Sequence, residues 1–273
     1  MTREGHGATE PAFQALMHEI AKTHGFRCDA YKQGCIRRRI GARMRARGVH
    51  RYDAYAALLR RDPVEARRLL DALTIHVSRF YRNPETWDVI ATTVLPELWK
   101  RRAGRLRCWS AGCAEGEEPH TLAMLLLEQE RREGWSAPRS VIDATDYDET
   151  SLERAAGGSY ARAAIKDLPA RFTRRYCEGQ DPVVLAPDVR RLVRLARHDL
   201  TREPPPAPPY DLVLCRNVVI YFDSRTQERI VSALTDALAP GGCLVLGKVE
   251  TIRGEARARL VLENPRERIY RLR

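Results

Sequence analysis

The chain has 273 residues, 44% of them hydrophobic, which is enough for a sizeable core in one large domain or in a small domain joined to a larger one. It contains no run of about 18 apolar residues and begins without the apolar stretch of a signal peptide, so we expect a cytoplasmic protein that is not inserted in a membrane. The formal net charge is +11, and residues 1–80 hold 16 basic against 8 acidic residues, which predicts an acidic partner for this part of the chain.

The first predicted elements are helices. Apolar residues recur at helical spacing in four segments: residues 11–25, 35–48, 51–61 and 63–77. The apolar face of the first segment consists of Phe13, Leu16, Met17 and Ile20, and that of the second of Ile36, Ile40 and Met44. Residues 11–73 are therefore predicted to form a small all-helical N-terminal domain, followed by a connecting segment at residues 74–105.

From Leu106 onward, short apolar runs alternate with helical segments, as expected for a parallel sheet in an α/β fold. The runs predicted to be strands are residues 106–111, 140–146, 192–198, 211–217 and 243–248. The last two apolar segments, RARLVLEN and ERIYRL, surround the turn sequence Asn264-Pro265-Arg266 and predict an antiparallel hairpin. The proline-rich tract at residues 203–209 is predicted to be a stiff loop between two strands.

The turn after the first predicted strand, residues 112–119, has the sequence GCAEGEEP. In an open α/β sheet this turn lies at the carboxyl edge, where ligands bind. It lacks the G-x-G-x-x-G pattern of a dinucleotide site and the lysine of a nucleoside triphosphate site. Its carboxylates, Glu115, Glu117 and Glu118, suit a cationic ligand such as S-adenosylmethionine. The alternative is that they only favour the first turn of a helix through its dipole.

A second acidic residue, Asp146, ends the next predicted strand, where nucleoside-binding α/β folds place a ribose-binding carboxylate. The alternative is that Asp146 simply caps the following turn. The two acidic features together favour an adenosine-containing ligand without phosphate. The seven cysteines are scattered without zinc-ligand spacing, so neither a metal site nor a disulfide framework is predicted.

Five segments, in this order, resemble the CheR-type chemotaxis receptor methyltransferases, which methylate receptor glutamates. They are IRRRIGARMRARGV, TIHVSRFYRNPETW, WSAGCAEGEEPHTLAM, ATDYDETSLERAAGGSY and DLVLCRNVVIYFD. The resemblance covers nearly the whole chain. It implies a Rossmann-like, class I S-adenosylmethionine-dependent methyltransferase domain at residues 106–273, with a small β insertion at about residues 172–194. The implied enzyme is a protein-glutamate O-methyltransferase that converts S-adenosyl-L-methionine to S-adenosyl-L-homocysteine.

Carried over by position, the resemblance implies a set of cofactor contacts: His76, Ser78, Arg82, Gly112, Glu118, Asp146, Asp199, Leu200, Asn217 and Val218. It also implies that Arg82 and Tyr221 form the catalytic pair that meets the substrate carboxylate. A glutamate with a pKa near 4.3 is already ionised at neutral pH, so the reaction needs positioning rather than a base. The alternatives are a structural ion pair for Arg82 and a packing role for Tyr221.

Residues 30–52 contain no acidic residue, and Arg39, Arg43 and Arg47 recur at i, i+4 and i+8 in the second predicted helix. The resemblance suggests that this row docks the acidic methylation helices of a chemoreceptor. No aromatic platform or helix-turn-helix pattern accompanies the arginines, so we expect no nucleic-acid partner. The alternative is a solvated basic face. We expect a monomer.

The sequence departs from the family pattern in a few places. Ala114-Glu115 replaces Ser-Thr, His120 replaces Tyr, and Lys248-Val249 stands where many members have His-Ser. The β insertion has only Gly179 in its turn, without the glycine-rich loop of members that bind a receptor's C-terminal pentapeptide, so pentapeptide-independent action is predicted. The alternatives are a cofactor-binding scaffold without catalysis and a methyltransferase that acts on an acidic protein outside chemotaxis. A nicotinamide-dependent oxidoreductase is a further alternative, but it needs a glycine fingerprint that the sequence lacks.

Overall fold

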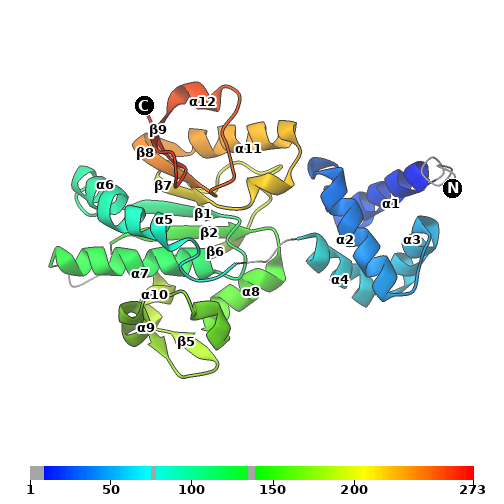
Figure 1. The fold of residues 1–273 in the computed structure, drawn as a ribbon, viewed down its shortest axis with the longest axis horizontal. Helices are drawn as coiled ribbons and strands as arrows, with labels where there is room; N and C mark the ends of the chain where they lie inside the picture. Colours follow the sequence, from blue (N-terminus) through cyan, green and yellow to red (C-terminus); the bar gives the residue numbers. More distant parts are fainter. Residues whose placement is uncertain (1–8, 75–77, 135–138) are drawn as a thin grey trace. The chain divides into compact units, whose positions relative to one another are not determined.

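The computed structural model describes residues 9–74, 78–134 and 139–273, and these form two compact units (Figure 1). The first unit holds the described residues up to 74 together with Tyr221–Thr226. The second unit holds the described residues from 78 to 220 and from 227 to 273. No helix in the described part of the chain is long and apolar enough to cross a membrane.

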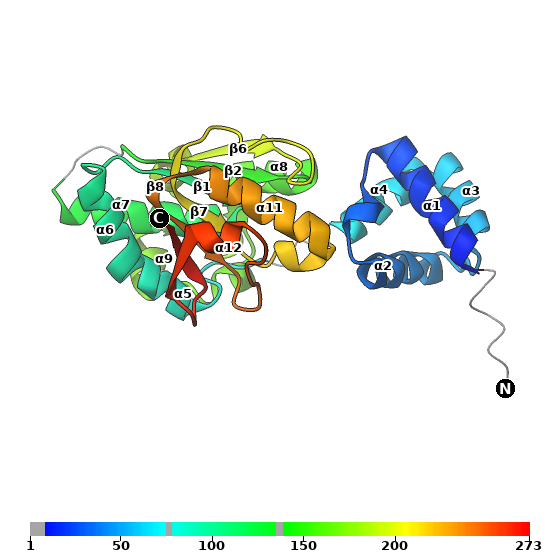
Figure 2. The ribbon, with the colours of Figure 1, turned by 90° about the horizontal axis from the view of Figure 1, so that it is seen from above.

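The first unit consists of α-helices and one 3₁₀ turn, coloured blue to cyan in Figure 2. They are α1 (Thr9–His24), the 3₁₀ turn η1 (Cys28–Ala30), α2 (Gln33–Ala46), α3 (Tyr52–Arg61) and α4 (Pro63–Leu73). The predicted apolar faces are confirmed, because Phe13, Ile20, Ile36 and Ile40 are all buried. Helix α4 begins where the Asp62 side chain accepts a hydrogen bond from the Glu65 N–H at 3.0 Å.

A distant stretch of chain, Tyr221–Thr226, completes the first unit. The Lys32 N–H donates to the Tyr221 carbonyl at 2.9 Å, and the Asp223 N–H donates to the Ala30 carbonyl at 3.0 Å. The Phe222 ring packs on Tyr31 with a centroid distance of 4.6 Å. The helical unit is therefore built from two stretches that lie far apart in the sequence.

The second unit is built on a seven-stranded sheet in the order β6-β2-β1-β7-β8-β10-β9. The strands are β1 (Arg107–Ala111), β2 (Val141–Asp146), β6 (Val193–Arg197), β7 (Tyr210–Cys215), β8 (Leu238–Leu246), β9 (Leu260–Asn264) and β10 (Ile269–Leu272). The first five are parallel, and β10 runs antiparallel to both neighbours. Both the predicted parallel sheet and the closing hairpin are confirmed. Every residue of β7 is buried, as expected for a parallel strand covered on both faces.

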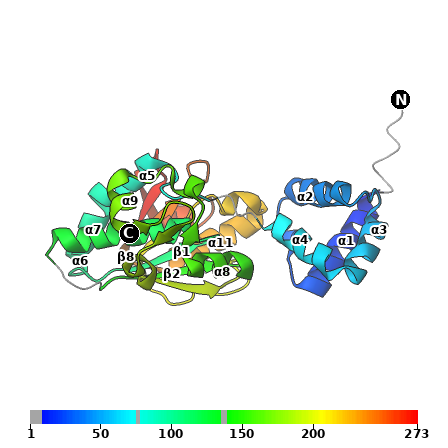
Figure 3. The same cartoon turned by 90° about the horizontal axis from the view of Figure 1, so that it is seen from below.

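Helices cover this sheet. They are α5 (Pro84–Val89), the π-helical segment η2 (Ile90–Val94), α6 (Leu95–Arg101), α7 (Glu117–Arg132), α8 (Glu149–Gly157), α11 (Ser224–Asp236) and α12 (Ala256–Arg259). Helix α7 contacts β1 and β2, and α6 lies beside α7 in Figures 1 and 3. The predicted connecting segment thus contains α5, η2 and α6, which were not predicted from the sequence. Trp87 and Leu98 from this segment pack with Leu122 and Leu126 of α7 in one core.

A small insertion follows α8. It contains β3 (Ser159–Tyr160), the 3₁₀ turn η3 (Arg162–Ile165), α9 (Ala170–Tyr176), β4 (Cys177–Glu178), β5 (Val183–Leu185) and α10 (Pro187–Arg191). Its strands form a three-stranded antiparallel sheet in the order β3-β5-β4. The predicted β insertion therefore exists but begins at Ser159, before residue 172, because β3 is too short to give a sequence signal.

The strand order fixes where a ligand can bind. From β1 the parallel strands proceed to β2 and β6 on one side, and to β7 and β8 on the other. The direction of winding therefore reverses between β1 and β7, and the carboxyl ends of these two strands form the topological switch point. Ligands of open α/β sheets bind in the crevice at that point.

Candidate active site

The loops after β1 and β7 touch at the switch point because residue 112 is glycine. Gly112 has φ +80°, and a Cβ built there would lie 2.6 Å from Cγ2 of Val218. Any other residue would strain this left-handed backbone and would have to displace the Val218 side chain. Two of the predicted cofactor residues, Gly112 and Val218, are thus brought together.

A buried carboxylate holds the turn after β7. Glu250 Oε2 accepts hydrogen bonds from the N–H groups of Asn217 at 2.9 Å and Gly247 at 2.6 Å, and its Oε1 accepts from the Ile220 N–H at 3.1 Å. A Cβ on Gly247 would lie 2.8 Å from the Asn217 backbone nitrogen. Burial raises the pKa of Glu250, while the backbone N–H groups oppose that rise. The predicted cofactor residue Asn217 is therefore fixed in a left-handed conformation, with φ +61°.

Glu118, a predicted cofactor residue in the first turn of α7, forms a buried ion pair. Its Oε1 accepts a hydrogen bond from Ser110 Oγ at 2.9 Å, and its Oε2 lies 3.6 Å from Nη1 of Arg216. The Arg216 side chain is only 3% exposed. Burial raises the pKa of Glu118, and the Arg216 charge counteracts this. The pair keeps a carboxylate beside the crevice while limiting the cost of its burial.

Glu117 is the most unusual carboxylate of this loop. It is 4% exposed, and burial raises its pKa to about 7, with nearby Glu115 adding to the shift. Its side chain hydrogen bonds to Ser78, another predicted cofactor residue. Its Oε2 has no hydrogen-bond partner among the described residues. By contrast, Glu115 forms an ion pair with Arg154.

Asp146 ends β2 and ties two loops together. Its Oδ2 accepts from the Ala114 N–H at 2.9 Å, and its Oδ1 accepts from the Asp148 N–H at 3.0 Å. The expected capping role is therefore present, and it aligns this carboxylate with the loop after β1. Whether Asp146 also binds a ribose stays a prediction.

The loop after β6 joins the same edge. The His198 N–H donates to the Asp146 carbonyl at 2.9 Å. Asp199 is buried, and its Oδ1 accepts from the N–H and hydroxyl of Thr201 at 2.8 and 2.6 Å. Asp199 and Leu200 thus follow a strand end that is bonded to Asp146, and their contacts with the cofactor stay a prediction.

Arg82 lies in a tightly held turn of the second unit. The residues on both sides of it are left-handed, Tyr81 with φ +56° and Asn83 with φ +58°. The Tyr81 N–H donates to Thr121 Oγ1 at 3.2 Å, and Arg216 Nη2 donates to the Arg82 carbonyl at 2.7 Å. The charge of Arg82 acts to lower the pKa of Glu118, against the rise that burial causes. His76 lies outside the described residues.

Tyr221 packs with the first unit, and Arg82 with the second. The Tyr221 ring lies 5.8 Å from the guanidinium carbon of Arg39. The joint action of Arg82 and Tyr221 on one carboxylate therefore stays a prediction.

The arginine row of α2 makes contacts inside its own unit. Arg39 Nη1 donates to the Ala72 carbonyl at 2.7 Å, at the end of α4. Arg43 forms a fork with Glu65, at 3.1 Å from Nε and 2.5 Å from Nη2. Arg47 Nη2 lies 3.1 Å from Asp62. The sequence predicted an outward-facing row, but Glu65 and Asp62 engage two of its members.

The departures from the family pattern have local partners. His120 is buried, with its Nδ1 2.9 Å from the Tyr160 hydroxyl, and burial lowers its pKa to about 4. Lys248 Nζ lies 3.0 Å from Glu85 and 3.3 Å from Glu267. Val249 is 71% exposed. The altered positions are therefore accommodated without an unpaired buried charge.

The crevice fits S-adenosylmethionine by its donor and acceptor set. The cofactor offers an ammonium group, a sulfonium and ribose hydroxyls. The carboxylates Glu117, Glu118 and Asp146 lie at the start of α7 and at the end of β2. Two buried acceptors, Glu117 Oε2 and Asn217 Oδ1, have no partner among the described residues and suit such cationic or hydroxyl donors. Arg216 and Glu250 were not predicted from the sequence, although Arg216 stands inside the segment DLVLCRNVVIYFD and Glu250 lies just beyond Lys248-Val249.

Comparisons with known proteins cover both units. Residues 11–74 match the family model "CheR methyltransferase, all-alpha domain", and residues 76–267 match "CheR methyltransferase, SAM binding domain". A "Chemotaxis protein methyltransferase" of Listeria innocua is 32% identical over 87% of this chain and 88% of its own length. A "Probable biofilm formation methyltransferase" of Pseudomonas aeruginosa is 34% identical over 79% of this chain and 51% of its own length. An uncharacterized 104.1 kDa protein of Rhodobacter capsulatus is 38% identical over 81% of this chain, which spans only 23% of that protein.

Proposed function

The chain belongs to the CheR methyltransferase family, and on this premise we propose that it uses S-adenosylmethionine to form methyl esters on glutamates of a chemoreceptor in the cytoplasm. The observation that carries the proposal is the pair of buried, unpartnered acceptors, Glu117 Oε2 and Asn217 Oδ1, in the loops that follow β1 and β7 at the switch point. When bound, the cofactor supplies an electrophilic methyl group on a sulfonium. Everything else must come from the chain's own side chains.

The cofactor would be held by residues from four loops of the second unit. Glu118, paired with Arg216, would face the ammonium group, with Ser78 and Arg82 beside it. Asp146 would accept from the ribose hydroxyls, while Asp199, Leu200, Asn217 and Val218 would border the rest of the molecule. The contacts of Gly112 with Val218 and of Glu250 with Asn217 support this assignment, because they fix the loops before any ligand arrives.

Arg82 and Tyr221 would hold the substrate carboxylate. The guanidinium fork binds a carboxylate through two parallel hydrogen bonds, and a tyrosine hydroxyl can fix one oxygen. No general base is needed, since the attacking glutamate is ionised at neutral pH. Holding the two reactants in line can lower the barrier by about 7–11 kcal/mol.

Docking of the receptor would use helix α2. Arg43 and Arg47 are partly neutralised by Glu65 and Asp62, although both retain exposed surface. Arg38 and Arg45 lie seven residues apart on the exposed side of the same helix. We therefore propose that these two arginines, together with the outer parts of Arg39, Arg43 and Arg47, steer an acidic helix toward the site.

Action without a pentapeptide tether is also proposed. The turn between β4 and β5 contains only residues 179–182, with Gly179 at φ +77°. A receptor lacking its last five residues should therefore be methylated as fast as the intact receptor. A clear loss of rate with the shortened receptor would contradict this proposal.

The test of the main proposal is transfer of a labelled methyl group to an acidic receptor fragment, with base treatment releasing the label as methanol. Arg82→Ala should lower kcat by at least about 100-fold. Arg79→Ala is the matched control, because Arg79 lies in the same segment but pairs with Asp167 at 3.0 Å and is half-exposed. A base-stable product, or full activity of Arg82→Ala, would refute the assignment.

A second candidate is methylation of an acidic protein outside motility. It is favoured by the likeness to the Pseudomonas protein, whose name refers to biofilm formation. The same labelling experiment on a lysate of the source organism identifies the acceptor by its labelled peptide.

A further inference from the structure

Arg216 is a buried cation whose contacts reach three separate parts of the second unit. It follows β7, and its side chain is 3% exposed. Nη1 faces Glu118 of α7 at 3.6 Å, Nη2 donates to the Arg82 carbonyl at 2.7 Å, and the guanidinium carbon lies 5.1 Å from the Trp87 ring centroid. The same Nη2 lies 3.2 Å from Asn83 Oδ1. One planar group therefore links the proposed cofactor carboxylate to the segment that carries the proposed substrate arginine.

The turn around Arg82 needs such a contact. Positive φ is uncommon outside glycine, and for a bulky residue such as Tyr81 it persists only where the surroundings enforce it. Several hydrogen bonds hold it. The Tyr81 N–H donates to Thr121 Oγ1 and the Tyr81 hydroxyl to Asp88, while Arg216 donates to the Arg82 carbonyl and to Asn83 Oδ1. Releasing one of them would let the backbone relax and turn the Arg82 side chain away.

The chemistry of these contacts requires arginine. Two nitrogens of one rigid fork serve a carboxylate, a carbonyl and an amide oxygen at once, and a lysine ammonium cannot reproduce that geometry. Burial without such partners would be costly for a charge. The contacts of Arg216 therefore depend on the planar shape of the guanidinium as well as on its charge.

We propose that Arg216 is a positioning residue for methyl transfer, which holds the Arg82 turn in its reactive conformation while neutralising Glu118. This inference rests on the proposed function, because it assigns a purpose to Arg82. A positioning role and a simple buried ion pair predict different effects of replacing Arg216 by lysine. Arg216→Lys keeps a positive charge for Glu118 but loses the fork that reaches the Arg82 carbonyl and Asn83.

The test is a double-mutant cycle of Arg216→Lys and Arg82→Ala. In the wild-type background Arg216→Lys should lower kcat by about 100-fold, the effect of displacing reacting groups by about 1 Å. The dissociation constant of S-adenosylhomocysteine should change far less, because the charge beside Glu118 is retained. In the Arg82→Ala background the same substitution should change kcat by no more than about twofold. Equal losses in both backgrounds, or unchanged kcat in the wild-type background, would overturn the proposal.

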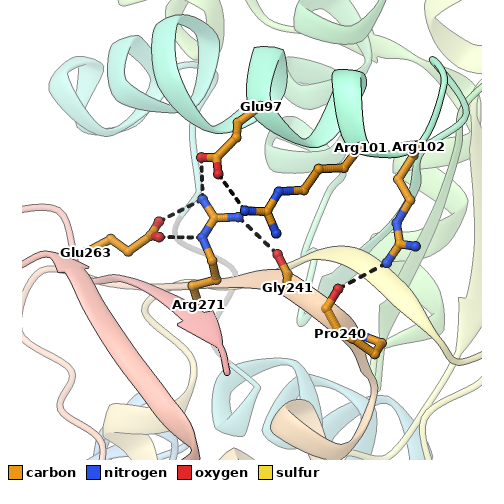
Figure 4. Close-up of polar contacts among 7 residues, drawn as sticks. All are labelled: Glu97, Arg101, Arg102, Pro240, Gly241, Glu263 and Arg271. Carbon is orange, nitrogen blue, oxygen red and sulfur yellow. Dashed lines mark hydrogen bonds and ion pairs between the residues drawn. The ribbon is translucent and has the colours of Figure 1, made fainter.

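The matched control is Arg271→Lys. Arg271 is also a buried fork, with a side chain 11% exposed, but it binds Glu97, Glu263 and the Gly241 carbonyl (Figure 4). Gly241 lies near the beginning of β8, and the proposed site lies at the other end of that strand. Arg271→Lys should lower the melting temperature without the selective loss of kcat.

A second readout does not depend on any methyl acceptor. Amide hydrogen exchange in peptides covering residues 79–88 should be faster in Arg216→Lys than in the wild type, and unchanged in Arg271→Lys. Unchanged exchange in Arg216→Lys would refute the positioning role, whereas faster exchange with no methyl transfer by any variant would refute only the proposed function.

If Arg216→Lys does not fold, Asn83→Gly takes its place, since glycine tolerates the left-handed conformation but removes one acceptor of Arg216. It should likewise speed exchange in this segment, and wild-type exchange would refute the proposal.

Discussion

Replacing Gly112 by alanine tests whether the loops after β1 and β7 must touch. The new Cβ would lie 2.6 and 3.0 Å from the two γ-carbons of Val218, so no rotamer of that residue avoids both contacts. The left-handed backbone, with φ +80°, costs an alanine about 1–2 kcal/mol. Overpacking against Val218 adds about 1–3 kcal/mol. We expect Gly112→Ala to lower the free energy of unfolding by about 2–5 kcal/mol and to weaken binding of S-adenosylhomocysteine.

The structure offers a control for each part of this sum. Gly134 has φ +75° and no atom within 4 Å of the position that a Cβ would take, so Gly134→Ala measures the backbone cost alone. Val218→Ala in the Gly112→Ala background should restore the packing part. Urea unfolding followed by tryptophan fluorescence reports on the second unit, because Trp87, Trp99 and Trp109 are all buried there. Equal destabilisation by Gly112→Ala and Gly134→Ala would show that the close approach to Val218 is not required.

Two further predictions concern buried carboxylates. Burial raises the pKa of Glu117 to about 7, so its folded form binds the proton more tightly than the unfolded chain, and stability should fall as pH rises from about 4.5 to 7. Glu117→Gln should remove this slope and stabilise the protein by up to about 3 kcal/mol at pH 8 but not at pH 4, in urea titrations; a pH-independent difference would contradict the reasoning. Burial acts to raise the pKa of Glu65, but hydrogen bonds from Arg43 and Tyr55 outweigh it, so the pKa is lowered and this stabilisation should be lost as pH falls below about 4.5. Arg43→Ala should cost the helical unit about 3 kcal/mol by circular dichroism, and the exposed Arg45→Ala almost nothing; equal effects would refute the role of the pair.

Repeating patterns in the sequence predicted the long elements well. The helical faces around Phe13 and Ile36 and the five parallel strands were predicted correctly. Elements that are buried on one or both sides have apolar residues at regular spacing or in continuous runs. Strand β8 begins at Leu238 rather than 243, because Pro240 and Gly241 suggest a turn although they belong to the strand. Helices α5 and α6 were not predicted, since each has at most seven residues and the π-helical segment between them breaks the helical period.

The candidate site could be predicted only where its residues follow strands. Asp146 and Asn217 stand at strand ends, and their positions in the sequence suffice to bring them to one edge. Arg216 and Glu250 act through partners that are distant in the sequence, such as Arg82, 134 residues away, so no local pattern marks them. The pairing of Arg43 with Glu65 was missed for the same reason, because a row on one helix says nothing about the helix that packs against it.

The return of Tyr221–Thr226 to the helical unit has a consequence during synthesis. At about 5–20 residues per second, a ribosome needs roughly 7–30 s to proceed from residue 75 to residue 221. Until then, Lys32 and Ala30 lack the hydrogen bonds that Tyr221 and Asp223 provide. The packing of the helical unit near Tyr31 is therefore completed only after Tyr221–Thr226 have been synthesised, so translation of the second unit sets the earliest time of this folding step.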